Sequence, residues 1–161
     1  MSSESWIGLP TRRQLLRETA DYIEDFAEWT HFATLTYGQR RACSTLRRHY
    51  RLLRSVLAFA AAPEHIPLCF AVGPQSDGVL HAHLLAAMPP RLAGGHTGRH
   101  LKRLWRLLTG GNAHVEPYAR GKGAAGYLPR HPAWELDLAC PRTGACGRGM
   151  RRLVAAPPSL T

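Results

Sequence analysis

The sequence is poor in acidic residues and has no long apolar run. Its 11 Asp and Glu residues are outnumbered by 21 Lys and Arg residues, which gives a formal net charge of +10 and a pI near 10.3. No apolar run reaches the ~20 residues that span a bilayer, and the polar N-terminus lacks the apolar core of a signal peptide. We therefore expect a cytoplasmic protein without a membrane anchor. The positive charge favours a polyanionic partner, nucleic acid ahead of an anionic membrane surface.

The four cysteines are too few and too scattered for the framework of a secreted disulfide-rich domain. Cys43 lies in a helical pattern and Cys69 in a strand pattern, so we expect both to be buried and reduced. Cys140 and Cys146 are farther apart than the cysteines of a zinc knuckle, and no second pair accompanies them. This spacing argues against a structural zinc site.

Apolar periodicity predicts a single α+β domain. A chain of 161 residues with 45% hydrophobic content can bury one core and leaves little room for a second. Helical spacing covers residues 10–28, 40–61 and 97–109, and a turn or short helix rich in Gly and Ala covers 121–130. Alternating or continuous apolar runs predict strands over 32–37, 66–72, 79–87, 113–118 and 134–138. This order favours a central antiparallel five-stranded sheet with helices packed on one face.

Composition divides the chain into three parts. Residues 1–28 form an N-terminal helical extension, and residues 29–139 contain the sheet. Residues 140–161 are rich in Pro, Gly and Arg, and we expect them to form a flexible basic tail. A turn around Asp77 joins the second and third expected strands as a hairpin, which places strand 79–87 inside the sheet.

Two histidines, His81 and His83, occupy alternate positions of the expected strand 79–87. Alternate side chains of a strand point to the same face, so both imidazoles project from one side with their Cα atoms about 7 Å apart. Polar rings are costly to bury without partners, and this pair therefore points to a shared divalent ion. The alternative is a pair of partly exposed histidines on a solvated face.

Three motifs then follow one another in a familiar order. Residues 34–36 (Thr-Leu-Thr) lie on the first expected strand, 81–83 (His-Ala-His) on the third, and 127–130 (Tyr-Leu-Pro-Arg) after the fourth. They resemble motifs I, II and III of the HUH endonucleases, which include the rolling-circle replication initiators of the Rep type. Residues 78–85 are similar to the family's Gly-x-Leu-His-x-His-x-Leu pattern, and 123–127 to its approach to the catalytic tyrosine. The resemblance covers about two-thirds of the chain and implies an HUH- or RRM-like sandwich.

The resemblance implies an activity as well as a fold. It makes Tyr127 the single nucleophile that forms a 5′-phosphotyrosine link to single-stranded DNA, because a tyrosine ester preserves the energy of the broken bond. It makes Mn²⁺ or Mg²⁺ the ion held by His81 and His83, and imidazole ligands suit Mn²⁺ better than Mg²⁺. Without the other two motifs, Tyr127 would be read as a tyrosine packed on a helix with its hydroxyl at the rim.

Two positions depart from the family pattern. The family's lysine three residues after the tyrosine is Arg130 here, which supplies charge to a phosphate but does not act as a proton donor. The family often has a metal-binding glutamate eight positions before the first histidine, where this chain has Gly73. Gln75 or Asp77 could complete the site, and Asp77 is the better donor for a hard cation. The sequence around Asp77 favours a turn aspartate before a glycine over a metal ligand.

The remaining site residues are those expected to contact DNA. Arg120 and Lys122 precede Tyr127 and are expected to hold the strand near the scissile phosphate, together with Thr34 and Thr36 of motif I. The expected substrate is single-stranded DNA of an origin or hairpin of a plasmid or phage-like element, and the chain has no helicase domain, so a host helicase is an expected partner. The alternative is a nucleic-acid-binding module that keeps the HUH fold without cutting. An RRM-like RNA-binding protein is disfavoured because the aromatic-rich strand is missing.

Overall fold

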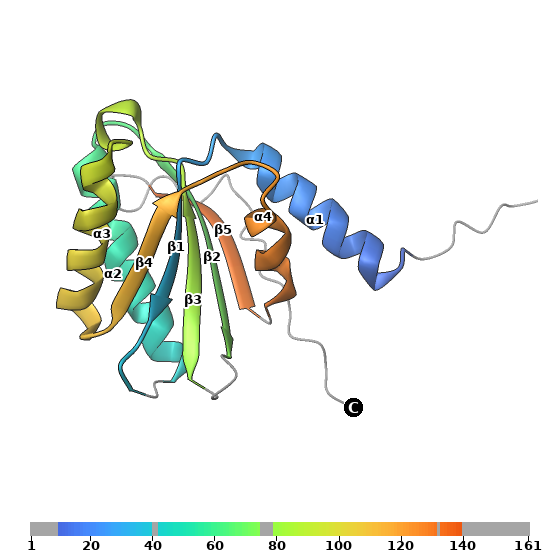
Figure 1. Cartoon of the computed structure of the whole chain (residues 1–161), viewed down its shortest axis with the longest axis horizontal. Coiled ribbons are helices and arrows are strands. Elements are labelled where there is room, and N and C mark those ends of the chain that lie inside the picture. Colours follow the sequence, from blue (N-terminus) through green and yellow to red (C-terminus); the bar gives the residue numbers. More distant parts are fainter. Residues whose placement is uncertain (1–9, 40–41, 75–78, 132, 140–161) are drawn as a thin grey trace, which may run out of the picture.

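A computed structural model describes residues 10–39, 42–74, 79–131 and 133–139, which form one antiparallel sheet with helices on both of its faces (Figure 1). The strands are β1 (His31–Thr36), β2 (Ile66–Pro74), β3 (Leu80–Ala86), β4 (Asn112–Pro117) and β5 (Ala133–Ala139). Their order in the sheet is β4-β1-β3-β2-β5, and every neighbouring pair is antiparallel. The predicted α+β fold, the hairpin of β2 and β3 and the inner position of the histidine strand are confirmed.

Helices pack on both faces of the sheet, and not on one face only as the sequence suggested. The elements are α1 (Arg12–Phe26), α2 (Cys43–Ala61), α3 (Gly95–Thr109), α4 (Ala124–Tyr127) and the 3-10 turns η1 (Pro90–Leu92) and η2 (Leu128–Arg130). Helices α2 and α3 lie on one side of the sheet, and α1 and α4 lie on the other (Figure 1). The cause is that β3 is apolar on both faces: Leu84 packs in the core under α2 and α3, and Leu85 packs in the core under α1 and α4.

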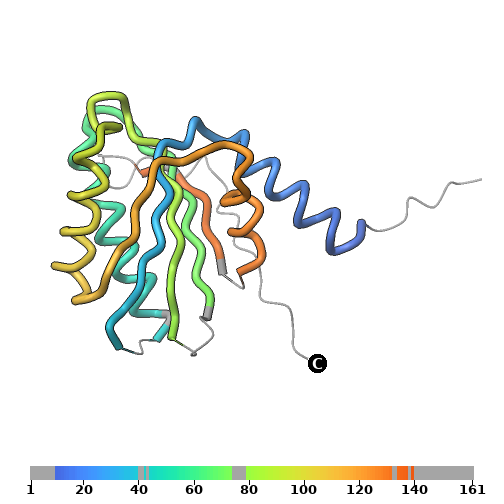
Figure 2. The backbone as a smooth tube through the Cα atoms, viewed as in Figure 1, coloured from blue at the N-terminus to red at the C-terminus, as the bar shows by residue number. Residues whose placement is uncertain are grey.

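Helix α1 belongs to the folded unit through its C-terminal half. Thr11 caps its first turn in a reciprocal capping box with Gln14. Ile23 is fully buried in the same core cluster as Leu128, and the Trp29 indole Nε1 donates a buried hydrogen bond of 2.7 Å to the Ile23 carbonyl. The tube in Figure 2 shows α1 running from this anchored end past α4 and away from the sheet. The start of α1 therefore projects beyond the sheet.

One prediction on cysteine is confirmed, and two other cysteines lie outside the described residues. Cys69 is a free, buried thiol of β2, as expected, and its burial raises its pKa. Cys140, Cys146 and the tail 140–161 lie outside the described residues. Within the described part of the chain, no helix combines the length and the apolar character needed to cross a membrane.

Candidate metal centre and nucleophile

His81 and His83 project from the same face of β3, as the strand pattern predicted. Their ring centroids lie 4.7 Å apart, and both residues are buried. In the register of the sheet, His81 pairs with Thr36 and His83 with Thr34 of β1. The two expected motif I threonines are therefore direct cross-strand neighbours of the two histidines. The alternative of two histidines on a solvated face does not hold.

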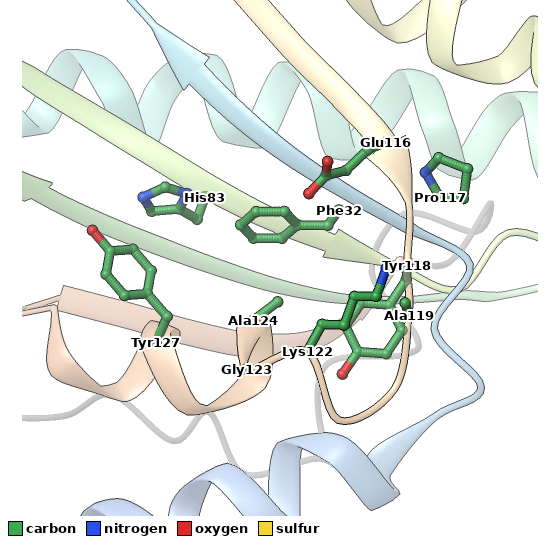
Figure 3. A pocket seen from close by; sticks show the side chains of 10 residues that line it. All are labelled: Phe32, His83, Glu116, Pro117, Tyr118, Ala119, Lys122, Gly123, Ala124 and Tyr127. Atoms are coloured by element: carbon green, nitrogen blue, oxygen red, sulfur yellow. The ribbon is translucent and has the colours of Figure 1, made fainter.

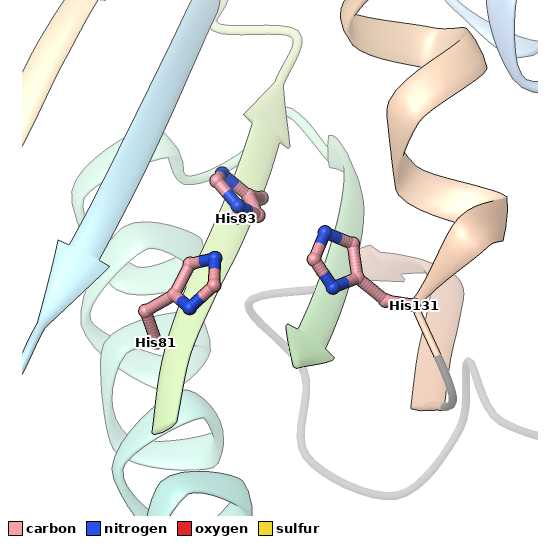
Figure 4. Close-up of side chains that lie close together, drawn as sticks. All are labelled: His81, His83 and His131. Atoms are coloured by element: carbon pink, nitrogen blue, oxygen red, sulfur yellow. The ribbon is translucent and has the colours of Figure 1, made fainter. Parts of the chain in front are cut away.

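A third histidine joins this pair. His131 directly follows η2, and its ring centroid lies 5.6 Å from that of His81 and 5.0 Å from that of His83 (Figure 4). One ring nitrogen from each of the three histidines can be chosen so that all lie within 4.8 Å of one another. This spacing is close enough for one metal ion to be held by all three side chains. The sequence analysis did not include His131, although it stands four positions after Tyr127, where a helical turn brings two side chains to one face.

The His131 ring occupies the space in front of Gly73. A Cβ atom built at Gly73 would lie 2.0 Å from His131 Nδ1 and 2.8 Å from its Cε1, closer than real Cβ contacts. Gly73 is paired with His81 across the β2–β3 hairpin, so this space is next to the histidine pair. A glutamate at position 73, as in the HUH pattern, would therefore overlap with the His131 ring. Gln75 and Asp77, the third ligands considered from sequence, lie outside the described residues.

The histidine nitrogens are arranged as metal ligands require. The Thr34 hydroxyl lies 3.2 Å from His83 Nδ1. If Nδ1–H donates to that hydroxyl, the lone pair of the ring is on Nε2, as a metal ligand needs. The Nε2 atoms of His83 and His131 are buried and have no hydrogen-bond partner among the described residues. Buried nitrogens without a partner are costly, so these atoms fit a bound cation.

Burial also favours the neutral form of His83 and His131. Removal from water, and then the proximity of His81 and His131, lower the pKa of His83 to about 3. Burial, followed by the neighbouring His81, lowers the pKa of His131. A neutral imidazole is the form that binds a metal, so no proton has to be displaced from these rings at neutral pH.

Tyr127 ends α4 beside this cluster. Its ring centroid lies 4.9 Å from that of His83 and 4.7 Å from that of His131, both in edge-to-face geometry. Figure 3 shows the Tyr127 ring pointing toward His83, and the side chain keeps 42% of its surface exposed. Pro129 follows in η2, where the α-helix has already given way to a 3-10 turn. The proline therefore does not remove Tyr127 from the histidines, and the turn leads directly to His131.

A cavity of about 460 Å³ opens next to Tyr127. Figure 3 shows it between the sheet and the segment that leads into α4. Aromatic and polar side chains line it together: Phe32, His83, Glu116, Tyr118, Lys122 and Tyr127. The Phe32 ring stacks on His83 with centroids 5.5 Å apart and planes at 4°. The cavity thus places His83 of the histidine cluster next to the aromatic rings of Phe32 and Tyr118 and to the exposed ammonium group of Lys122.

The other residues expected to contact DNA have separate positions. Lys122 is exposed at the cavity beside Tyr127. Arg120 instead pairs with carboxylates of α1: its guanidinium contacts Asp25, and its Nε lies 3.7 Å from Glu24. The Thr36 hydroxyl donates to the Asn112 carbonyl at 3.1 Å. Arg130 does not line the cavity but lies on the side of η2 that faces α1.

We compared the chain with models of protein families, with curated proteins and with solved structures, and none of them matched.

Proposed function

We propose that this protein is a metal-dependent, single-tyrosine endonuclease and strand transferase that acts on single-stranded DNA in the cytoplasm. It would initiate rolling-circle replication of a plasmid or phage-like element at an origin or hairpin, with a host helicase to unwind the duplex. The observation that carries the proposal is the position of Tyr127, an exposed phenol whose ring lies within 5 Å of two of three clustered histidines. The resemblance to the HUH motifs supports the same assignment.

The proposed chemistry is a transesterification. The Tyr127 oxygen attacks the scissile phosphorus and loses its proton to water, and the bond from phosphorus to the 3′ oxygen breaks. The departing 3′ oxygen takes up a proton, which leaves a free 3′-hydroxyl and a 5′-phosphotyrosine. Because the energy of the phosphodiester is kept in the tyrosine ester, a second 3′-hydroxyl can reverse the reaction and join two strands.

Three imidazoles fit a divalent transition metal. His81, His83 and His131 would hold it, and the bound ion would polarise the scissile phosphate and offset the charge that develops on its oxygens. Nitrogen ligands suit Mn²⁺ better than Mg²⁺, which prefers oxygen. We therefore propose Mn²⁺, ahead of Mg²⁺, as the working ion. Thr34 would act as a positioning residue, because its hydroxyl sets which nitrogen of His83 carries the lone pair.

The cavity beside Tyr127 suits the nucleotide next to the scissile phosphate. Lys122 would contact a phosphate, and the aromatic wall that includes Phe32 and Tyr118 would face the base. Glu116 is an acceptor on the same wall, and it would repel a phosphate but accept hydrogen bonds from the amino edge of a base. The charges and rings that line the cavity are therefore complementary to a nucleotide and less so to a free anion.

The experiment is detection of a covalent adduct. The full chain is incubated with Mn²⁺ and a pool of single-stranded oligonucleotides, and SDS-resistant protein–DNA species are mapped by mass spectrometry. Tyr127→Phe removes only the nucleophilic oxygen and should abolish the adduct. Tyr118→Phe is the matched control, because it deletes a hydroxyl on the same cavity wall that donates to Glu24, and its adduct should persist.

Other outcomes are informative as well. An adduct that maps to Tyr118 would overturn the assignment of the nucleophile. Absence of any adduct from the unmodified chain, with single-stranded DNA still bound, would favour the non-cutting nucleic-acid module. That second function has one observation on its side: Arg130, which resembles the family's basic residue after the tyrosine, faces α1 and not the cavity.

A further inference from the structure

A second groove lies on the other side of the segment that carries Tyr127. It has a volume of about 730 Å³ and runs between the first half of α1 and the α4–η2 segment. Four arginines line it, three from α1 and one from η2: Arg12, Arg13, Arg17 and Arg130. Leu16, Ala20 and Gly126 also line it, and a Cβ at Gly126 would lie 3.9 Å from the Ala20 Cβ. The groove therefore combines four arginines with small and apolar residues.

The four guanidinium groups are available for a ligand. All four residues are exposed, and none of them forms an ion pair with a carboxylate in the part of the chain that the structure describes. The contrast is with Arg120, which is on the opposite end of the same α1–α4 interface and is paired with Glu24 and Asp25. Glu24 and Asp25 at the C-terminal end of α1 are thus taken up by Arg120, and neither Glu18 nor Asp21 forms an ion pair with a groove arginine among the described residues.

This arrangement is unfavourable for α1 by itself. The first turn of α1 contains Arg12 and Arg13 and no acidic residue, although a helix N-terminus is stabilised by negative charge. Arg13 and Arg17 are four positions apart on the helix surface, where like charges repel. Arg130 adds a fourth positive charge from η2. A polyanion in the groove would offset each of these repulsions and would place negative charge near the N-terminus of α1.

We infer that the α1–α4 groove binds the sugar–phosphate backbone of single-stranded DNA, in continuity with the cavity at Tyr127. The ligand is a phosphodiester chain because the groove offers four cations and, among the residues that the structure describes, no aromatic side chain on which a base could stack. The two sites share one short segment: Tyr127 faces the histidines, while Gly126 and Arg130 face α1. The identity of the ligand rests on the proposed function, but the location of the groove does not.

The test compares two variants that lose equal charge. Arg12→Gln/Arg13→Gln/Arg17→Gln removes three of the four positive charges of the groove, and Arg47→Gln/Arg48→Gln/Arg51→Gln neutralises three exposed arginines of α2, beyond the opposite face of the sheet. Both are made in the full chain with Tyr127→Phe, so that binding is measured without cleavage. Fluorescence anisotropy with a labelled mixed-sequence single-stranded oligonucleotide is recorded between about 50 and 200 mM salt.

The groove variant should bind at least about tenfold more weakly at low salt. Its slope of log affinity against log salt should become shallower by up to about 2, because each phosphate contact on a single strand contributes roughly 0.7. The α2 variant should stay close to the parent in both measurements. A further variant, Arg13→Lys/Arg17→Lys, keeps the charges and should keep most of the slope. The thermal midpoint of the groove variant should be unchanged or higher, since neutralisation relieves repulsion in α1.

Equal losses in the two triple variants would overturn the groove assignment and leave only a diffuse effect of net charge. Tighter groove-dependent binding of RNA or duplex DNA than of single-stranded DNA would also overturn it, in favour of that nucleic acid. The adduct assay separates this proposal from the proposed function. If the unmodified chain forms no adduct but the groove variant still loses binding, the nuclease fails and the groove stands; the reverse pattern refutes the groove alone.

Discussion

At the scale of single residues, the candidate metal centre depends on the space that Gly73 leaves for the ring of His131. A side chain at position 73 would overlap with the imidazole of His131, because a Cβ atom built at Gly73 lies 2.0 Å from His131 Nδ1. The absence of a side chain on β2 therefore lets a ligand arrive from the η2 turn instead. This arrangement offers three candidate nitrogen ligands, whereas a glutamate on β2 would have offered a carboxylate oxygen.

Gly73→Ala tests this exchange without touching a ligand. The added methyl group must push the His131 ring away from His81 and His83, so Mn²⁺ affinity should fall by about tenfold or more. The free energy of unfolding should fall by roughly 1–3 kcal/mol as well, because the methyl overpacks a buried position. Isothermal titration with Mn²⁺ and urea unfolding measure the two effects. His131→Ala should lose metal affinity similarly but without the overpacking penalty.

Gly98→Ala is the matched control. A Cβ at Gly98 would meet Val115 Cγ1 at 3.6 Å, an ordinary contact, and Gly98 lies inside α3 on the far side of the sheet. This variant should bind Mn²⁺ like the parent and gain about 0.5–1 kcal/mol of stability from the better helix former. Unchanged Mn²⁺ binding in Gly73→Ala would show that His131 is not a ligand.

The sequence identified part of this site and not the rest, for physical reasons. His81 and His83 were predictable because strand periodicity alone puts them on one face. His131 was not predicted, since its ring reaches the site from a different element and replaces a side chain that the sequence only shows to be missing. Arg120 was expected on DNA, but carboxylates of α1 that are far away in sequence pair with it. Strand periodicity was therefore enough to predict the histidine pair. The third histidine and the pairing of Arg120 depend on tertiary packing, which the local sequence does not show.

At the scale of elements, the strands were predictable and the layering was not. Each predicted strand corresponds to an observed one, and no end differs by more than two residues, because the apolar runs have glycine or proline near their ends. The position of α1 could not be derived from its amphipathic pattern, which shows that one side is buried but not against which face. The structure resolves this through Trp29, whose indole joins the end of α1 to the start of β1.

Trp29→Phe should loosen α1 and weaken DNA binding. It leaves the Ile23 carbonyl, buried at the end of α1, without the indole donor, and such a group costs roughly 1–3 kcal/mol. Urea unfolding should show that loss. Because α1 carries three of the groove arginines, affinity for single-stranded DNA should fall too, while Mn²⁺ affinity changes little.

Trp105→Phe provides the comparison on the opposite face. The Trp105 indole also donates to a backbone carbonyl, that of Thr36, at 3.0 Å, and this residue of α3 is fully buried. It should lose a comparable amount of stability but retain DNA affinity under conditions where the chain is folded. If both variants lose DNA affinity in proportion to stability, α1 has no separate role in binding.

At the scale of the whole molecule, exposed arginines lie on both sides of the sheet, whereas the histidine cluster and Tyr127 lie on one side. Net charge of +10 indicates a polyanionic partner without locating it. The arginines of α2 and α3, including Arg47 and Arg103, belong to helices on the far side from the histidines. Those on α1 and η2 flank the Tyr127 segment. The asymmetry predicts that DNA affinity responds to where a charge is removed and not only to how many are removed.

The buried histidines also make the stability of the whole fold depend on pH. Burial lowers the pKa of His31, His83 and His131 below the value of 6.5 that a histidine has in an unfolded chain, to about 3 for His83. Between about pH 6.5 and 3 the unfolded chain therefore binds protons that the folded chain does not, and stability must fall as the pH falls. Each such histidine contributes at most about 1.4 kcal/mol per pH unit.

Urea unfolding between pH 7.5 and pH 5 measures this dependence, and a histidine variant identifies its source. His83→Gln should make the loss of stability toward acid shallower, because glutamine takes up no proton in either state. His65→Gln is the control for the substitution itself, since His65 is exposed and lies outside the histidine cluster. Saturating Mn²⁺ should stabilise the parent at pH 7.5 and should still stabilise it at pH 5, because His83 stays neutral in the folded chain at that pH. Stability that rises on acidification, or an unchanged slope in His83→Gln, would mean that the histidine cluster is not held neutral by the fold.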